Sequence, residues 1–217
     1  PEQYRRSYCR ILSGLLLMTI PIVVYLGVYS RDVIGIILGP QWLDVAPIFS
    51  ALALAGALQT PAMATGWLFI SQGRTKEQFK WGVFAGVTTI LCFAVGLRWG
   101  ALGVAKAYVG AALFQLPLLV RYATRTGPVS SWDYTAAVVV PVCFGATVTL
   151  VLMVLSTQMV DASAGARLSV GAGAILLLAA ATYVLSRDTR DASAAFVRML
   201  KVARSAPTPD QTETRSL

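Results

Sequence analysis

Six long apolar runs follow one another along this 217-residue chain, and they constrain its fold more than any other feature. Each is close to the roughly 20 residues that an α-helix needs to cross the hydrocarbon core of a bilayer. Only 13% of the residues are charged, against about 25% in typical soluble domains. Because lipid cannot hydrogen-bond the backbone, such runs form helices. The sequence therefore predicts an all-α polytopic membrane protein with six transmembrane helices, over residues 11–29, 45–70, 81–97, 101–120, 134–156 and 167–185.

The basic residues are distributed unevenly between the two sides that these spans define. Fourteen of the 18 lysines and arginines fall on the side that holds both ends of the chain. The opposite side carries Arg31, Arg98 and Arg167. Cytoplasmic loops are enriched in Lys and Arg, so both termini are predicted to be cytoplasmic. Since topology accounts for the net charge of +8, we expect no nucleic-acid partner.

Two segments follow the last span. Residues 186–204 place Ala192, Phe196, Met199 and Leu200 at helical spacing, with the basic residues largely off that stripe. This pattern predicts an amphipathic helix on the cytoplasmic membrane surface. Residues 205–217 are polar and predict a disordered tail.

Residue types that carry catalysis or bind metals are scarce. The chain has no histidine, and its ten acidic residues all lie outside the six spans. The three cysteines, Cys9, Cys92 and Cys143, are too far apart for a metal-binding motif. Proton relays in membranes usually need buried carboxylates or histidines. We therefore expect no metal, no cofactor and no enzymatic activity.

A membrane enzyme of envelope glycan assembly, such as a polymerase or ligase, is the alternative from a different functional class. Its acidic candidates on the outer side are Asp32, Asp44 and Asp161. The outer loops that hold them are short, so we favour loop and capping roles over a catalytic pair.

Prolines interrupt several spans, and polar residues accompany one of them. Pro21 and Pro61 lie inside the first and second spans, where each removes a backbone donor and favours a bend. Transporters use such interrupted helices to build a cavity and a hinge. Beside Pro61, Gln59 and Thr60 are candidates to line a substrate cavity and hydrogen-bond sugar hydroxyls. The alternative is that they hydrogen-bond the backbone freed by the bend.

Apart from Arg167, the first residue of the last span, Lys106 is the one formal charge inside a predicted span. A charge at mid-membrane costs roughly 2.5–3.5 kcal/mol on insertion scales. Lys106 lies about five residues from the outer end of its span, or about 7.5 Å deep at 1.5 Å per residue. Its ammonium can therefore extend to the interface, or it can attract a diphosphate group. Gln115, on the opposite helix face, is either a cavity residue or a hydrogen bond between helices.

Several segments resemble a known transporter family. They are an entry segment with Pro1-Glu2 and Arg5-Arg6, the central Pro21, DVIGIILGPQW at residues 32–42 followed by API, and WGALGVAKAY at residues 99–108. Together they resemble polysaccharide-transporter flippases of the multidrug/oligosaccharidyl-lipid/polysaccharide (MOP) exporter superfamily. The colanic-acid and O-antigen type exporters are the most similar group, and the resemblance covers about residues 1–122.

This resemblance implies a protein of 12 to 14 helices in two lobes around a central cavity. Undecaprenyl-diphosphate-linked oligosaccharides would cross the bacterial cytoplasmic (inner) membrane by alternating access, for surface polysaccharide or lipopolysaccharide biosynthesis. The six spans would form most of the C-terminal lobe, so we expect a preceding N-terminal lobe as a partner, together with the lipid-linked oligosaccharide and membrane lipids. Another MOP exporter, for drugs or a peptidoglycan precursor, is the alternative within the superfamily.

Overall fold

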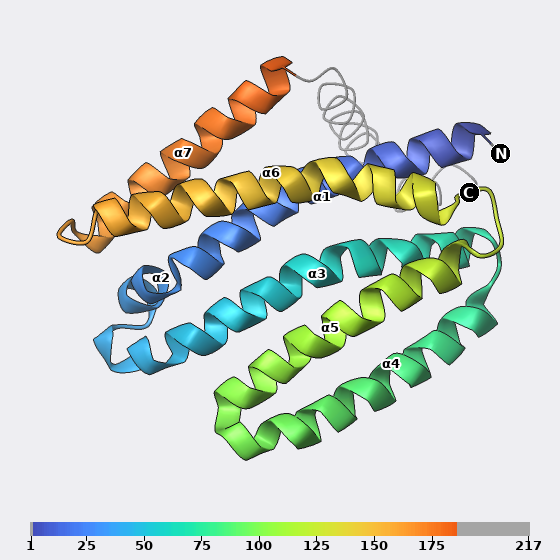
Figure 1. Cartoon of the computed structure of the whole chain (residues 1–217), viewed down its shortest axis with the longest axis horizontal. Helices are drawn as coiled ribbons and strands as arrows, with labels where there is room; N and C mark the ends of the chain where they lie inside the picture. The colour runs from blue at the N-terminus through green and yellow to red at the C-terminus, as the bar shows by residue number, and fades with distance from the viewer. Residues whose placement is uncertain (1, 186–217) are drawn as a thin grey trace, which may run out of the picture.

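The computed structural model describes residues 2–185, and all its regular elements in this range are helical (Figure 1). The helix 186–204 and the tail 205–217 expected from the sequence lie outside the described residues. The helices are α1 Glu2–Val28, α2 Ser30–Ile37, η1 Pro40–Val45, α3 Ala46–Ser71, α4 Thr75–Gly96, η2 Leu97–Trp99, α5 Gly100–Thr124, α6 Ser131–Gln158 and α7 Ala164–Leu185.

Five helical stretches are long and apolar enough to cross a membrane: Glu2–Val28, Pro40–Ser71, Thr75–Thr124, Ser131–Gln158 and Ala164–Thr182. The third contains both α4 and α5, since η2 joins them without a non-helical residue. The chain reverses direction at η2, so the two helices run side by side (Figure 1). The all-α, multi-pass membrane architecture is therefore confirmed. The depth at which each helix enters the bilayer stays a prediction.

Local sequence explains where several helices begin. At the start of α6, the Ser130 hydroxyl accepts a hydrogen bond from the Asp133 backbone N–H at 3.1 Å. The Asp133 carboxylate in turn accepts from the Ser130 N–H at 3.0 Å, which completes a capping box. Gly39, with φ of +96°, precedes Pro40 at the first position of η1. α1 begins nine residues before its predicted span, because polar residues 2–10 continue the same helix.

Helix α3 lies centrally in the bundle and packs on both α1 and α5 (Figure 1). α6 packs along α1, α4 pairs with α5, and α7 contacts α6. The main core lies where α1, α3, α5 and the start of α6 meet, and its fully buried side chains include Leu12, Leu16, Leu68 and Phe69. By contrast, Gly96 is the one buried residue of α4. The α4–α5 hairpin therefore presents most of α4 to its surroundings.

Two glycines allow the ends of α4 and α5 to come close together. A Cβ atom on Gly96 would lie 2.8 Å from the Gly103 carbonyl oxygen. A Cβ atom on Gly103 would meet the Gly96 carbonyl even more closely, and it would also lie 2.6 Å from the Trp99 Cβ. Gly100 then makes the turn with a φ of +69°, which is available to glycine at little cost. Small residues at this crossing thus set the hairpin geometry.

We predict that Gly103→Ala destabilises the protein while Gly110→Ala does not. Both glycines lie inside α5, where alanine is intrinsically favoured by about 1 kcal/mol. A Cβ atom at Gly110 meets no atom within 4 Å, so Gly110→Ala keeps the stabilisation that alanine gives a helix relative to glycine. Thermal unfolding of the purified protein in detergent measures the difference. Equal melting temperatures for the two variants would contradict the close hairpin contact.

Candidate functional site

The polar groups near Pro61 are tied to neighbouring helices. The Tyr134 hydroxyl of α6 donates to the Pro61 carbonyl at 2.6 Å, and the Tyr8 hydroxyl of α1 donates to the Ala64 carbonyl at 3.0 Å. Thr60 donates to the Gly56 carbonyl of its own helix at 3.1 Å. α3 continues through Pro61, as α1 does through Pro21, and both prolines are buried. Their role as hinges stays a prediction.

Gln59 and Gln115, predicted separately, line one cavity of about 440 Å³ between α3, α4 and α5. The Gln59 amide donates to the Tyr108 hydroxyl of α5. The Gln115 amide donates to the Ala85 carbonyl and to the Thr89 hydroxyl of α4, at 3.2 Å each. The polar side chains of this cavity are neutral, so they can donate and accept hydrogen bonds but cannot form ion pairs with a ligand.

Lys106 lies apart from this cavity. Its side chain is exposed on α5, near the η2 end of the helix and on the face opposite Gln115. Thr60, bonded within its own helix, does not line the cavity either. The structure therefore brings together two of the four candidate substrate residues. Any role of Lys106 toward a diphosphate stays a prediction.

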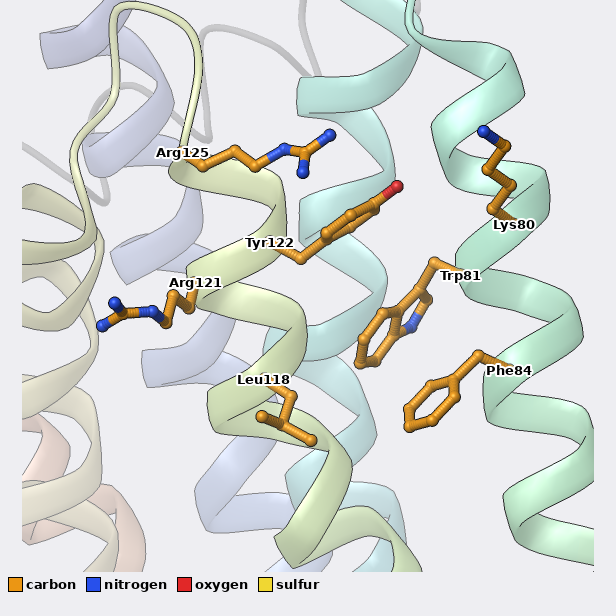
Figure 2. Close-up of a pocket in the computed structure, with 7 residues that line it drawn as sticks. All are labelled: Lys80, Trp81, Phe84, Leu118, Arg121, Tyr122 and Arg125. Atoms are coloured by element: carbon orange, nitrogen blue, oxygen red, sulfur yellow. The ribbon is translucent and has the colours of Figure 1, made fainter.

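A second cavity, of about 540 Å³, lies between the beginning of α4 and the end of α5 (Figure 2). The Trp81 and Tyr122 rings stack with centroids 5.9 Å apart, and the Arg125 guanidinium lies 4.5 Å from the centre of the Tyr122 ring. Trp81 also lines the cavity that holds Gln59 and Gln115, named the polar cavity from here on, so its indole borders both cavities. We name this cavity the basic–aromatic cleft; its lining residues are Lys80, Trp81, Phe84, Leu118, Arg121, Tyr122 and Arg125.

From sequence alone, the cations of this cleft are explained by membrane topology, and its aromatic rings carry no prediction. A signal was nevertheless present. The pairs Lys80-Trp81 and Arg121-Tyr122 stand at the two polar ends of one predicted hairpin. Helices of a hairpin run antiparallel, so these pairs must lie at the same depth. Adjacent basic and aromatic residues at matching depths can therefore predict such a cleft.

Arg74 ties the start of α4 to the end of α5, next to the cleft. Its guanidinium donates to the carbonyls of Ala123 and Thr126 at 2.9 Å each, which joins the start of α4 to the end of α5. Its second amino group donates to the Glu77 carboxylate at 2.7 Å, and Arg125 donates to the same oxygen at 3.0 Å. Hydrogen bonds from Arg74, followed by those from Arg125, lower the pKa of Glu77 from 4.5 to about 2. Glu77 lies before the predicted span of α4, among the polar residues 71–80.

An ion pair joins α2 and α7 at the opposite end of the bundle. Arg167 donates from Nε to the Asp32 carboxylate at 3.1 Å and from a second nitrogen to its other oxygen. Bidentate pairing of this kind commits the carboxylate to structure. Asp44 is exposed in η1, and Asp161 is exposed in the loop between α6 and α7. In residues 2–185, no group of three or more potential metal ligands comes together.

Over half of its length the chain matches a curated protein. It is similar to the lipopolysaccharide biosynthesis protein WzxC of Escherichia coli (strain K12). The identity is 25% over 109 residues, which cover 50% of this chain and 22% of WzxC. The match thus spans only about a fifth of the relative's length. No protein-family model and no solved structure matches the sequence.

We predict that acid weakens the link between the loops through Glu77. Its pKa falls from 4.5 to about 2 on folding, so the stabilisation is full above pH 4.5 and is lost as the pH falls toward 2. Melting temperature in detergent should decline more steeply over this window for the native protein than for Glu77→Gln. Asp161→Asn, at a carboxylate that forms no ion pair with a described basic residue, is the control and keeps the native slope. If the melting temperature of Glu77→Gln fell with pH as steeply as that of the native protein, Glu77 would not be the group that links the loops.

We predict a coupling between Gln115 and Thr89 of about 0.6 kcal/mol, the average for hydrogen bonds between transmembrane helices. The free energies of unfolding of Gln115→Leu, Thr89→Val and the double variant in bicelles give this coupling energy. Thr88 is a matched control, because its hydroxyl donates within α4 to the Phe84 carbonyl at 2.8 Å. Gln115→Leu and Thr88→Val should be additive. A Gln115–Thr89 pair that is additive as well would overturn the interhelical bond.

Proposed function

We propose that this chain is the C-terminal portion of a MOP-type flippase that moves undecaprenyl-diphosphate-linked oligosaccharides across the bacterial cytoplasmic membrane. The observation that carries the proposal is the similarity to a lipopolysaccharide biosynthesis protein, in a chain whose helices are built to cross a membrane. Within a whole transporter, the described bundle would be most of one lobe. The substrate would enter from the side that carries most of the lysines and arginines.

The chemistry of the polar cavity supports transport rather than catalysis. Amides and hydroxyls from Gln59, Thr89, Tyr108 and Gln115 line it. Such groups suit the repeated hydroxyls of sugars, which donate and accept hydrogen bonds. Acid–base catalysis would need a group that titrates near neutral pH, usually a histidine or a carboxylate. On the outer side, the Asp32 carboxylate is already paired with Arg167.

The test is deletion of the complete gene in its host, followed by localisation of the lipid-linked oligosaccharide. Loss of a flippase should abolish the surface polysaccharide and leave single repeat units on the cytoplasmic leaflet. Membrane-impermeant periodate applied to spheroplasts should then fail to oxidise those units. Plasmid-borne full-length protein should restore both the polymer and the oxidation.

Two other outcomes identify the alternatives. Loss of a polymerase or ligase leaves repeat units accessible to periodate at the outer face but not polymerised or attached. Loss of a drug exporter leaves the glycan unchanged and raises sensitivity to toxic compounds. Either outcome would overturn the flippase proposal.

A further inference from the structure

We propose that the basic–aromatic cleft binds an anionic membrane phospholipid, with its phosphate at the Lys80 and Arg125 end and an acyl chain against Phe84 and Leu118. This site is distinct from the polar cavity, where sugars are expected. It depends on the membrane placement of the α4–α5 hairpin, and it does not require the transported substrate to be a glycan.

The charge at the polar end of the cleft is not balanced within the described residues. Glu77 pairs with both Arg74 and Arg125, so one carboxylate faces two guanidinium groups. Lys80 forms no ion pair with any described residue. Figure 2 shows the Arg125 guanidinium over Tyr122 and the Lys80 ammonium on the facing helix. Between them a phosphate would find two cations from opposite walls.

Arg121 lines the cleft, but its guanidinium points away from the space between Lys80 and Arg125. In Figure 2 its guanidinium extends away from Trp81. There it also lines a neighbouring cavity of about 610 Å³ with Pro61 and Tyr134. Like Lys80, Arg121 forms no ion pair with a described residue. It therefore strengthens the local potential without occupying the head-group position.

Below the cations the cleft becomes apolar. Phe84 lies one helical turn beyond Lys80, and Leu118 lies about one turn before Arg121, so both are about 5 Å deeper. Trp81 stands between the two zones, with its ring 5.2 Å from Phe84 and 5.9 Å from Tyr122 between centroids. Tryptophan and tyrosine favour this depth, where one end of the ring meets head groups and the other meets chains.

A lipid matches this gradient better than other occupants do. Phe84 is 44% exposed and Leu118 is 39% exposed, so the apolar half opens to the surroundings of the bundle. A soluble phosphate compound would leave that half unfilled. A phospholipid supplies one anionic head and one apolar chain, in the order that the cleft requires.

Trp81 provides the experiment. The full-length protein, with its other tryptophans replaced by phenylalanine, is reconstituted into vesicles that contain brominated lipids, which quench tryptophan on contact. Brominated phosphatidylglycerol should quench Trp81 more effectively than brominated phosphatidylcholine. Lys80→Gln should weaken the preference about fivefold, the effect of one cation near an anionic head group. Lys76→Gln, a nearby exposed cation outside the cleft, should retain it.

Three results would overturn the proposal. Equal quenching by the two lipids would show that the cleft does not select an anionic head group. The same loss of preference in Lys76→Gln would assign it to general surface charge. Displacement of brominated phosphatidylglycerol by a small amount of polyprenyl diphosphate would assign the cleft to the transported lipid instead. Quenching by brominated phosphatidylcholine in every variant verifies that the proteins are inserted and folded.

Discussion

The absence of water in the bilayer is the constraint on which this structure depends. Backbone groups in lipid must be satisfied within the protein, and a buried polar side chain costs free energy unless it is hydrogen-bonded. Tyr8 and Tyr134 accordingly donate to carbonyls of α3, and Gln115 donates across to α4. The tyrosine bonds join the central helix α3 to α1 and α6, and the Gln115 bond joins α5 to α4, while ion pairs act at the two ends of the bundle. Arg74 acts at one end and the Arg167–Asp32 pair at the other.

The same constraint explains how much could be predicted from sequence. Hydropathy and length were sufficient for an all-α membrane bundle, because apolar runs have almost no other stable form in lipid. Residues 2–10 were not assigned to the first span because they are polar. In the structure they form the first part of α1. Hydropathy locates a membrane boundary, whereas backbone hydrogen bonding decides where a helix begins.

The candidate site was predictable only in part. Gln59 and Gln115 were chosen as isolated polar residues, and their shared cavity depends on how α3, α4 and α5 pack, which one sequence does not encode as a local pattern. Lys106 is predicted near the outer end of its span by counting residues, and the structure leaves its side chain exposed near the η2 end of α5. The basic–aromatic cleft was missed because each cation alone was explained by topology.

Function in this account requires that the two ends of the bundle lie on opposite sides of the membrane. The most direct test is thiol labelling of spheroplasts with a membrane-impermeant reagent, in full-length protein whose native cysteines are replaced. Arg98→Cys, within η2, should be labelled in sealed spheroplasts, and Lys76→Cys, in the first turn of α4, should be labelled only after permeabilisation. Labelling of both positions from the same side would contradict the account.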